Sequence, residues 1–184
     1  RALTGQEVLN FQNSPIAAGG AAESFTERVI TTTADGARSV IAVDMDDDGD
    51  IDVLSASRDD DKIAWYENDG GQAFTERVIS TSADSVRRVF AVDVDNDGDL
   101  DILSASDVDN RIAWYENDGS LGFTVHTIST TADLAKSAVG IDLDHDGDID
   151  VISASQNDDK IAWYENDGRQ NFATRIISTT AEGA

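Results

Sequence analysis

Short runs of apolar or alternating residues recur along the chain, separated by clusters of Gly, Asp, Asn and Ser. In their first occurrence the runs are Phe25–Thr31, Ser39–Asp44, Ile51–Ser57 and Lys62–Glu67. They are rich in Val, Ile, Phe, Tyr and Trp, and their length is typical of strands and too short for most helices. The one proline, Pro15, lies outside them, so none is excluded as a central strand.

The whole pattern repeats every 49 residues. The octapeptide Ile-Ala-Trp-Tyr-Glu-Asn-Asp-Gly begins at Ile63, Ile112 and Ile161, and Phe-Thr-Glu-Arg-Val-Ile occurs at both 25–30 and 74–79. We divide the chain into an N-terminal segment, three repeats and the start of a fourth repeat: 1–24, 25–73, 74–122, 123–171 and 172–184. Within the first of these segments, Glu7–Gln12 is a candidate for one added strand.

Four strands per period predict an all-β fold made of β-propeller blades, each with four antiparallel strands. The chain then holds three full 49-residue repeats plus a partial fourth. A calcium-bound β-solenoid is the alternative, but its coils repeat on a much shorter period and carry Gly-rich turns that this sequence lacks.

The charge of the chain excludes some partners. There are 37 acidic and 13 basic residues, a net charge of −24, which disfavours nucleic acid and anionic membranes because phosphate binding needs clustered Lys and Arg. No apolar run approaches the ~20 residues of a membrane helix, so we expect no membrane insertion. With no cysteine, disulfides and zinc–thiolate sites are impossible.

Three nine-residue loops carry aspartate at positions 1, 3, 5, 7 and 9, which together are fifteen of the acids, and glycine at position 6. Ca²⁺ takes six to eight oxygen ligands, and a tight turn can bring carboxylates at positions 1, 3 and 5 together. Position 7 can offer its backbone carbonyl and position 9 a last carboxylate. The candidate calcium ligands, about three ions per chain, are Asp44, Asp46, Asp48, Asp50, Asp52, Asp93, Asp95, Asp97, Asp99, Asp101, Asp142, Asp144, Asp146, Asp148 and Asp150.

Electrostatics supports this assignment. Five carboxylates in nine residues repel one another in an empty folded loop, and a divalent cation turns that repulsion into attraction. Mg²⁺ fits less well because it demands octahedral geometry, and zinc is disfavoured because His126 and His145 are not paired. The loops are not EF-hands, since position 12 is serine and a strand-like run follows. An acidic turn without metal is the alternative.

Other repeated side chains have structural explanations. Trp65, Trp114 and Trp163 could stack on sugars, but mid-strand tryptophans favour packing between blades. The adjacent Tyr66, Tyr115 and Tyr164 are predicted on the opposite face and at the surface, and Glu67, Glu116 and Glu165 at solvated edges. We find no nucleophile–base set or phosphate-binding loop, and the repeated acids are identical in each copy. The sequence therefore predicts no enzyme.

From about residue 25 to 184 the chain resembles the FG-GAP/VCBS repeats of integrin α-subunit propellers and many bacterial surface proteins. The resemblance rests on the Asp-x-Asp-x-Asp-Gly-Asp-x-Asp loop between two strands, followed by Ser-Ala-Ser and Ile-Ala-Trp-Tyr-Glu-Asn. It implies calcium binding by the side chains of loop positions 1, 3, 5 and 9 and by the carbonyl of position 7. The Phe-Gly and Gly-Ala-Pro signatures are missing, so integrin-like ligand recognition is not implied.

These observations predict an extracellular or cell-surface binding and adhesion scaffold in which Ca²⁺ is structural in each blade, with a protein or glycan ligand. Calcium affinities in the ~10⁻⁴–10⁻³ M class of extracellular modules would place it outside the cell, where calcium is abundant. A lectin-like sugar binder and an accessory propeller of a larger secreted enzyme are the alternatives. Since the family usually closes a ring of about seven blades, a homodimer completing a propeller ring is one hypothesis, and a fragment of a longer propeller is its rival.

Overall fold

The computed structural model describes residues 26–120 and 122–184, and in these residues the fold is all-β, with twelve strands and no helix. The strands are β1 (Ala37–Val43), β2 (Asp52–Ser57), β3 (Lys62–Asn68), β4 (Phe74–Ser80), β5 (Val86–Val92), β6 (Asp101–Ser106), β7 (Arg111–Asn117), β8 (Phe123–Ser129), β9 (Ala135–Ile141), β10 (Asp150–Ser155), β11 (Lys160–Asn166) and β12 (Phe172–Ser178). No helix in the described ranges is long and apolar enough to cross a bilayer.

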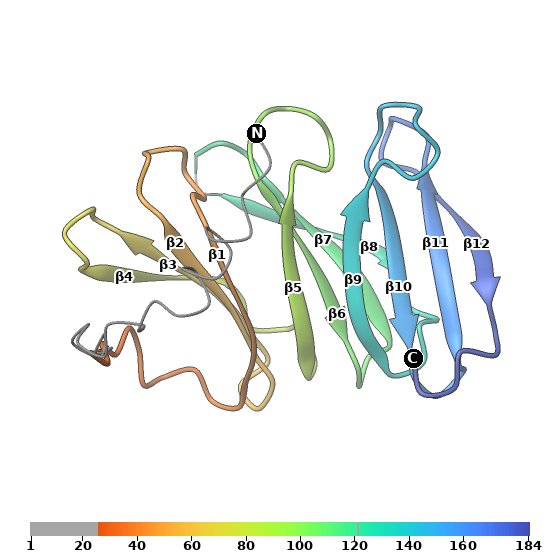
Figure 1. The fold of residues 1–184 in the computed structure, drawn as a ribbon, viewed down its shortest axis with the longest axis horizontal. Helices are drawn as coiled ribbons and strands as arrows, with labels where there is room; N and C mark the ends of the chain where they lie inside the picture. Colours follow the sequence, from red (N-terminus) through yellow and green to blue (C-terminus); the bar gives the residue numbers. More distant parts are fainter. Residues whose placement is uncertain (1–25, 121) are drawn as a thin grey trace, which may run out of the picture.

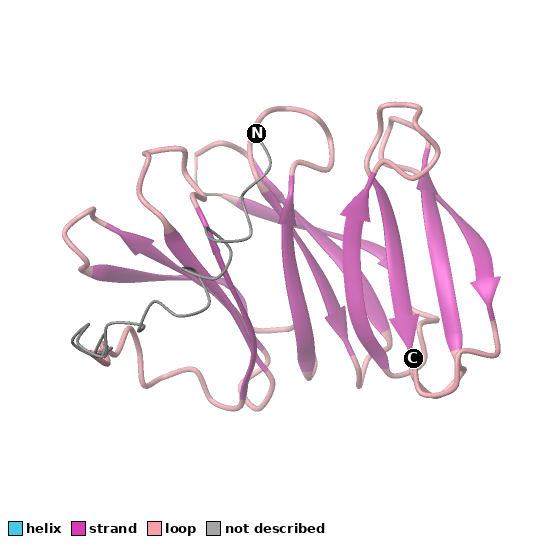
Figure 2. Ribbon diagram, in the orientation of Figure 1, coloured by secondary structure: helices cyan, strands magenta, loops and turns pink. Residues whose placement is uncertain are grey.

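The strands form three antiparallel sheets of four, each a simple meander: β1–β4, β5–β8 and β9–β12. The sheets stand in a row and do not close into a ring (Figure 1). Figure 2 shows that loops join the strands at both ends of every sheet. Strand β5 packs against β1 and β2, and β9 packs in the same way against β5 and β6. The predicted blades of four antiparallel strands are confirmed.

The sheets group the strands differently from the sequence repeat as we divided it. Phe74–Ser80, which opens the second repeat, pairs with β3 and is the fourth strand of the first sheet. In the same way Phe172–Ser178 completes the third sheet rather than starting another blade. A period defines the length of the unit but not its starting point, because only strand pairing decides which four runs share a sheet.

The predicted strand over residues 25–31 is wrong for the part that the structure describes. Residues 26–31 form no strand, and Val29 and Ile30 are exposed. The identical sequence at 74–79 is a strand because it pairs with β3. Phe25 and the candidate strand Glu7–Gln12 lie outside the described residues.

Each sheet has two apolar faces, which we name by their aromatic residue: the Trp face carries Trp65, Trp114 or Trp163, and the Tyr face carries Tyr66, Tyr115 or Tyr164. Side chains alternate between the faces along each strand. The Trp face of the first sheet packs on the Tyr face of the second, in one buried cluster that includes Leu54, Trp65, Val89 and Tyr115. The equivalent residues of the second and third sheets form the other core cluster.

The core therefore lies between sheets, as predicted for the tryptophans, and Trp65 and Trp114 are buried there. The prediction for the tyrosines is wrong: Tyr66, Tyr115 and Tyr164 do lie on the opposite face, but they are buried. Tyr115 and Tyr164 are buried against the preceding sheet, whereas Tyr66, in the first sheet, lines a groove together with residues of the segment before β1.

Connectors between sheets make a recurring set of hydrogen bonds. After β4, Ala83 N–H donates to the Asp61 carbonyl (3.2 Å) and Ser85 N–H to Asp61 Oδ1 (2.8 Å). After β8, Ala132 and Leu134 donate to Asn110 in the same way, and after β12 Ala181 and Gly183 donate to Asp159. Each sheet is thus joined to the segment that follows it by the same two bonds.

Candidate metal centre

Each aspartate loop connects the first two strands of a sheet, so all three occupy the same place in their blades. The turn requires left-handed backbone at two positions. Position 4 has φ of 57° at Asp47, 62° at Asn96 and 66° at His145, while the position-6 glycines have φ of 95°, 100° and 99°. Asn, Asp and Gly tolerate this region best, which explains the glycine and most of the residues chosen at position 4.

Hydrogen bonds inside the loop hold positions 1 and 5. In the first loop Gly49 N–H donates to Asp44 Oδ2 (3.0 Å) and Asp50 N–H donates to Asp48 Oδ1 (2.8 Å). The second and third loops repeat both bonds within 0.2 Å. The backbone thereby fixes one oxygen of each of these carboxylates.

The position-9 aspartates, Asp52, Asp101 and Asp150, are fully buried and close the loop. One oxygen of Asp101 accepts the N–H of Val94 (2.9 Å), at position 2, and the other accepts the N–H of Asn117 (2.8 Å), at the end of the third strand. Asp52 and Asp150 make the same pair of bonds. This carboxylate therefore has a structural role in addition to any metal that it binds.

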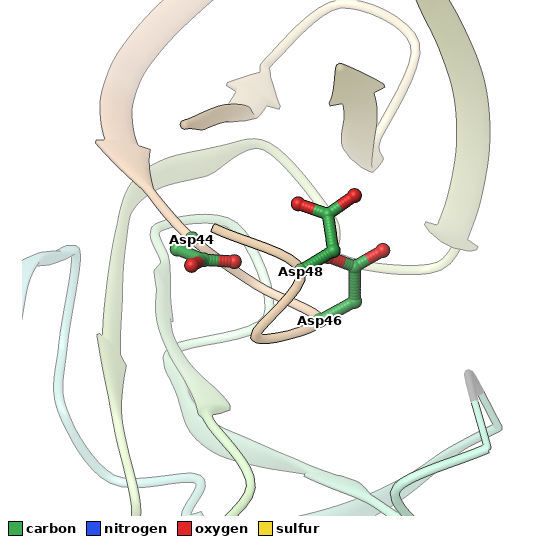
Figure 3. A group of neighbouring side chains, drawn as sticks. All are labelled: Asp44, Asp46 and Asp48. Carbon is green, nitrogen blue, oxygen red and sulfur yellow. The ribbon is translucent and has the colours of Figure 1, made fainter. Parts of the chain in front are cut away.

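Carboxylate oxygens from three aspartates come within 4.8 Å of one another in each loop. The groups are Asp44, Asp46 and Asp48; Asp93, Asp95 and Asp101; and Asp142, Asp144 and Asp146. Figure 3 shows the first group, with Asp46 and Asp48 side by side on the loop and the carboxylate of Asp44 directed toward them. The structure thus brings together the aspartates of positions 1 and 3 with that of position 5 or 9.

Two observations indicate that these groups suit a cation. Asp44 Oδ1 and Asp46 Oδ1 are buried without a hydrogen-bond partner, a costly state for a carboxylate unless something positive lies beside it. Desolvation, and after it repulsion from the position-5 carboxylate, raises the pKa of Asp46, Asp95 and Asp144 above the ordinary value of 3.8. An all-oxygen set of this kind fits a hard cation such as Ca²⁺.

The position-7 side chains do not join these groups. A Cβ placed on Gly70 would lie 2.4 Å from Asp50 Oδ2, and the equivalent approach of Asp99 to Gly119 is also 2.4 Å. The position-7 carboxylate therefore packs against the turn between the third and fourth strands, where only glycine leaves room. Its predicted metal contact through the backbone carbonyl stays a prediction.

Sequence reasoning missed the asparagine that ends each third strand. Asn68 Nδ2 donates to the Ile51 carbonyl (3.0 Å), Asn68 Oδ1 accepts the N–H of Gly70 (3.2 Å), and the Asn68 N–H binds Asp52. Asn117 and Asn166 do the same in their sheets. Its recurrence in all three octapeptides was the available signal, and it holds the loop against the neighbouring turn.

The glutamates before these asparagines do not stand alone at solvated edges. Glu67 pairs with Arg77 (2.5 Å), whose guanidinium lies 5.4 Å from the centre of the Trp65 ring. In the second sheet His126 takes the place of this arginine: it contacts Glu116 (2.6 Å) and stacks on Trp114 at 4.5 Å. The glutamate thus orients a cationic or aromatic cover over the tryptophan.

The model of the FG-GAP-like repeat matches this chain three times, over residues 44–104, 93–153 and 142–184. The chain belongs to the FG-GAP-like repeat family. Each match begins at position 1 of an aspartate loop, and the first two run into the following sheet, so in those two the loop and the inter-sheet contact are parts of one repeating unit. Among curated proteins no sequence matches the chain.

One solved structure similar to this FG-GAP-like repeat protein is a lectin of Agrocybe aegerita, described as recognising non-reducing terminal N-acetylglucosamine specifically. The TM-score is 0.54 at 16% sequence identity, and the match covers 79% of this chain. Only 39% of the lectin is covered, so the chain spans about two fifths of its length. At this identity the likeness concerns the fold alone.

The second loop gives a pH prediction. Burial raises the pKa of Asp101 from 3.8 to about 6, although the N–H groups of Asn117 and Val94 lower it. In the metal-free protein this group stabilises the fold below pH 3.8, and the contribution is lost as the pH rises through about 6.

Because Ca²⁺ needs the ionised carboxylate, calcium affinity at this loop should be about tenfold weaker at about pH 5 than at about pH 7. Isothermal titration calorimetry at both pH values measures it. The Asp101→Asn variant, which does not titrate at this position, should show a smaller change with pH. Equal affinity of the unchanged protein at both pH values would contradict the prediction.

Proposed function

We propose that this protein is a calcium-binding β-propeller-type module that acts outside the cell or at its surface as a binding and adhesion scaffold. One observation carries the proposal: the same crowded carboxylate group recurs in all three blades, with buried, unpartnered oxygens in the first. The aspartates of positions 1, 3, 5 and 9 would hold the ion, with the carbonyl of position 7. Extracellular calcium is abundant enough to fill sites of ~10⁻⁴–10⁻³ M affinity.

The bound ions would be structural. A divalent cation would neutralise part of the carboxylate charge and tie the first two strands of each sheet together through the loop that joins them. We propose no catalytic role for these residues, because identical acid sets in three blades suit a repeated structural site better than one reaction centre. Native mass spectrometry in calcium tests the proposal, with three ions per chain expected and none contradicting it.

A glycan is the ligand class with specific support. Beside the third loop lies a hollow of about 400 Å³ lined by acids, amides and one aromatic ring: Asp146, Glu165, Asn166, Asp167, Asn171 and Phe172. Such groups suit the hydroxyls and apolar ring faces of a sugar. The similar lectin makes this class worth testing first. A protein ligand and a role as part of a larger secreted enzyme stay as the other candidates.

Asn171 offers a matched variant for this second candidate, because the equivalent residues of the other repeats are Ala73 and Gly122. A glycan array probed with and without calcium should give hits that Asn171→Ala removes. An array without hits would leave a protein ligand. A homodimer that completes a propeller ring is a further candidate.

A further inference from the structure

Within residues 26–120 and 122–184, contact between a Trp face and a Tyr face forms twice. At each end of this stack the described residues place no sheet against one of these faces. At the third sheet it is the Trp face, and at the first sheet the Tyr face. The two faces that lack a neighbour are thus the two halves of an interface that this chain already makes. We propose that two copies associate head to tail, the Trp face of the third sheet of one packing on the Tyr face of the first sheet of the other.

Side chains on the Trp face of the third sheet are more exposed than the equivalent side chains of the first two sheets, which shows that this face has no packing partner in the described structure. Met45 and Val94, at position 2 of their loops, are 3% and 1% exposed because the next sheet covers them, whereas Leu143 is 38% exposed. The other equivalents follow the same trend. Residues buried in the first two sheets are only half-buried in the third, namely Ile152, Ala154, Ile161 and Trp163.

The Tyr face of the first sheet shows the same difference at Val40, although Tyr66 on that face stays buried. Val89 and Ala138 are each 1% exposed against the preceding sheet, but the equivalent Val40 is 69% exposed. Beside Val40 runs a groove of about 430 Å³ that reaches Val53 and Tyr66 and is bordered by Val29 and Ile30. Residues 26–34 therefore fill only part of the place that a whole sheet takes in the two internal interfaces.

A second copy can also reproduce the bonds of the connectors. Lys62 Nζ donates a hydrogen bond to the Thr33 carbonyl (2.9 Å), and the equivalent Arg111 donates one to the Ser82 carbonyl (2.7 Å). The segment before β1 is therefore bound to the first sheet in the same way as an internal connector is bound to its sheet. Its Ala34 and Gly36 are equivalent to Ala83 and Ser85. Within one chain, the N–H groups of Ala181 and Gly183 donate to Asp159. In the dimer, the N–H groups of Ala34 and Gly36 would donate to Asp159 of the other copy instead. The number of hydrogen bonds stays the same, and residues 179–184 are displaced.

Such an interface joins different surfaces of the two copies, so it either closes into a ring or continues as an open chain. A ring of two copies, with six sheets, is the smallest arrangement that covers every end face. The inferred association rests on the blade stack of the proposed function and does not require bound calcium.

Native mass spectrometry of the full chain in calcium tests this proposal, because it counts chains and ions separately. We expect a dimer for the unchanged protein, and monomers for Val40→Asp and for Leu143→Asp, each of which places a charge on one face. Val125→Asp is the matched control, since Val125 is 50% exposed on the outer strand β8 and should leave the dimer intact. Far-UV circular dichroism checks that each variant keeps its strands.

Mixing the two monomeric variants gives the sharpest result. Val40→Asp keeps an intact Trp face and Leu143→Asp an intact Tyr face, so the mixture should regain a dimer that contains one chain of each. An unchanged protein that stays monomeric at micromolar concentration overturns the proposal, and so does a Val40→Asp chain that dimerises alone. A monomer that carries three ions would refute the association and support calcium binding. A dimer without ions would support the association and refute calcium binding.

Discussion

Excess EGTA should lower the melting temperature of this protein by about 10 to 30 °C relative to the same protein in calcium. Calcium that binds only the folded state stabilises that state. At a calcium concentration of about 10 to 100 times the dissociation constant, each site stabilises the fold by about 1.4 to 2.7 kcal/mol, and three sites act together. The carboxylate groups of each loop contribute to this effect, because they repel one another when no cation is present.

Differential scanning calorimetry measures the effect, with the chelator added to one half of a single preparation. Magnesium at the same concentration is the control and should restore only a small part of the loss, because its octahedral geometry and tightly held waters suit these loops poorly. A melting curve that EGTA leaves unchanged would contradict structural calcium in the blades.

Asp101→Ala should destabilise the protein both in calcium and in EGTA, whereas Asp97→Ala should destabilise it only in calcium. Asp101 is fully buried and accepts the N–H groups of Val94 and Asn117, so its removal leaves two buried donors unpaired. Removal of the buried charge offsets part of that loss, and without metal the free energy of unfolding should fall by about 1–3 kcal/mol. Asp97 is exposed, and its bond to the Asp99 N–H can be replaced by water.

Urea denaturation of both variants and the unchanged protein, each in calcium and in EGTA, separates the two roles. Both substitutions remove a predicted ligand of the same ion, so both should weaken calcium binding at the second loop. If Asp101→Ala unfolds in EGTA at the same urea concentration as the unchanged protein, its carboxylate is not a structural link between the loop and β7.

Local sequence was sufficient to predict those strands and loops that have the same structure in every repeat. Strand length, alternation and turn residues predicted the second and third strands of every sheet, and the spacing of aspartate and glycine predicted the loops. The carboxylate groups form where expected, since a nine-residue turn fixes its own geometry. Of the aspartates at the five shared loop positions, those at positions 1 and 3 enter the group every time.

The position-9 aspartate shows where such reasoning ends. Its part as a ligand was predicted from the loop alone, but its bonds join residues as far apart as Asp101 and Asn117. The sequence repeat contains both residues, yet nothing in their spacing says that they touch. That contact depends on the pairing of β6 with β7, which brings the end of one strand beside the start of the other.

What the sequence by itself determined is the repeating unit: its length, its strands, its acidic loop and its family. Tertiary structure decided which four strands share a sheet and that both faces of a blade are buried, as Tyr115 is against the first sheet. The clearest case is Phe-Thr-Glu-Arg-Val-Ile, which is a strand at 74–79 and not over the described residues 26–30. A strand is stable only where a neighbouring edge accepts its hydrogen bonds, and β3 offers that edge to one copy alone.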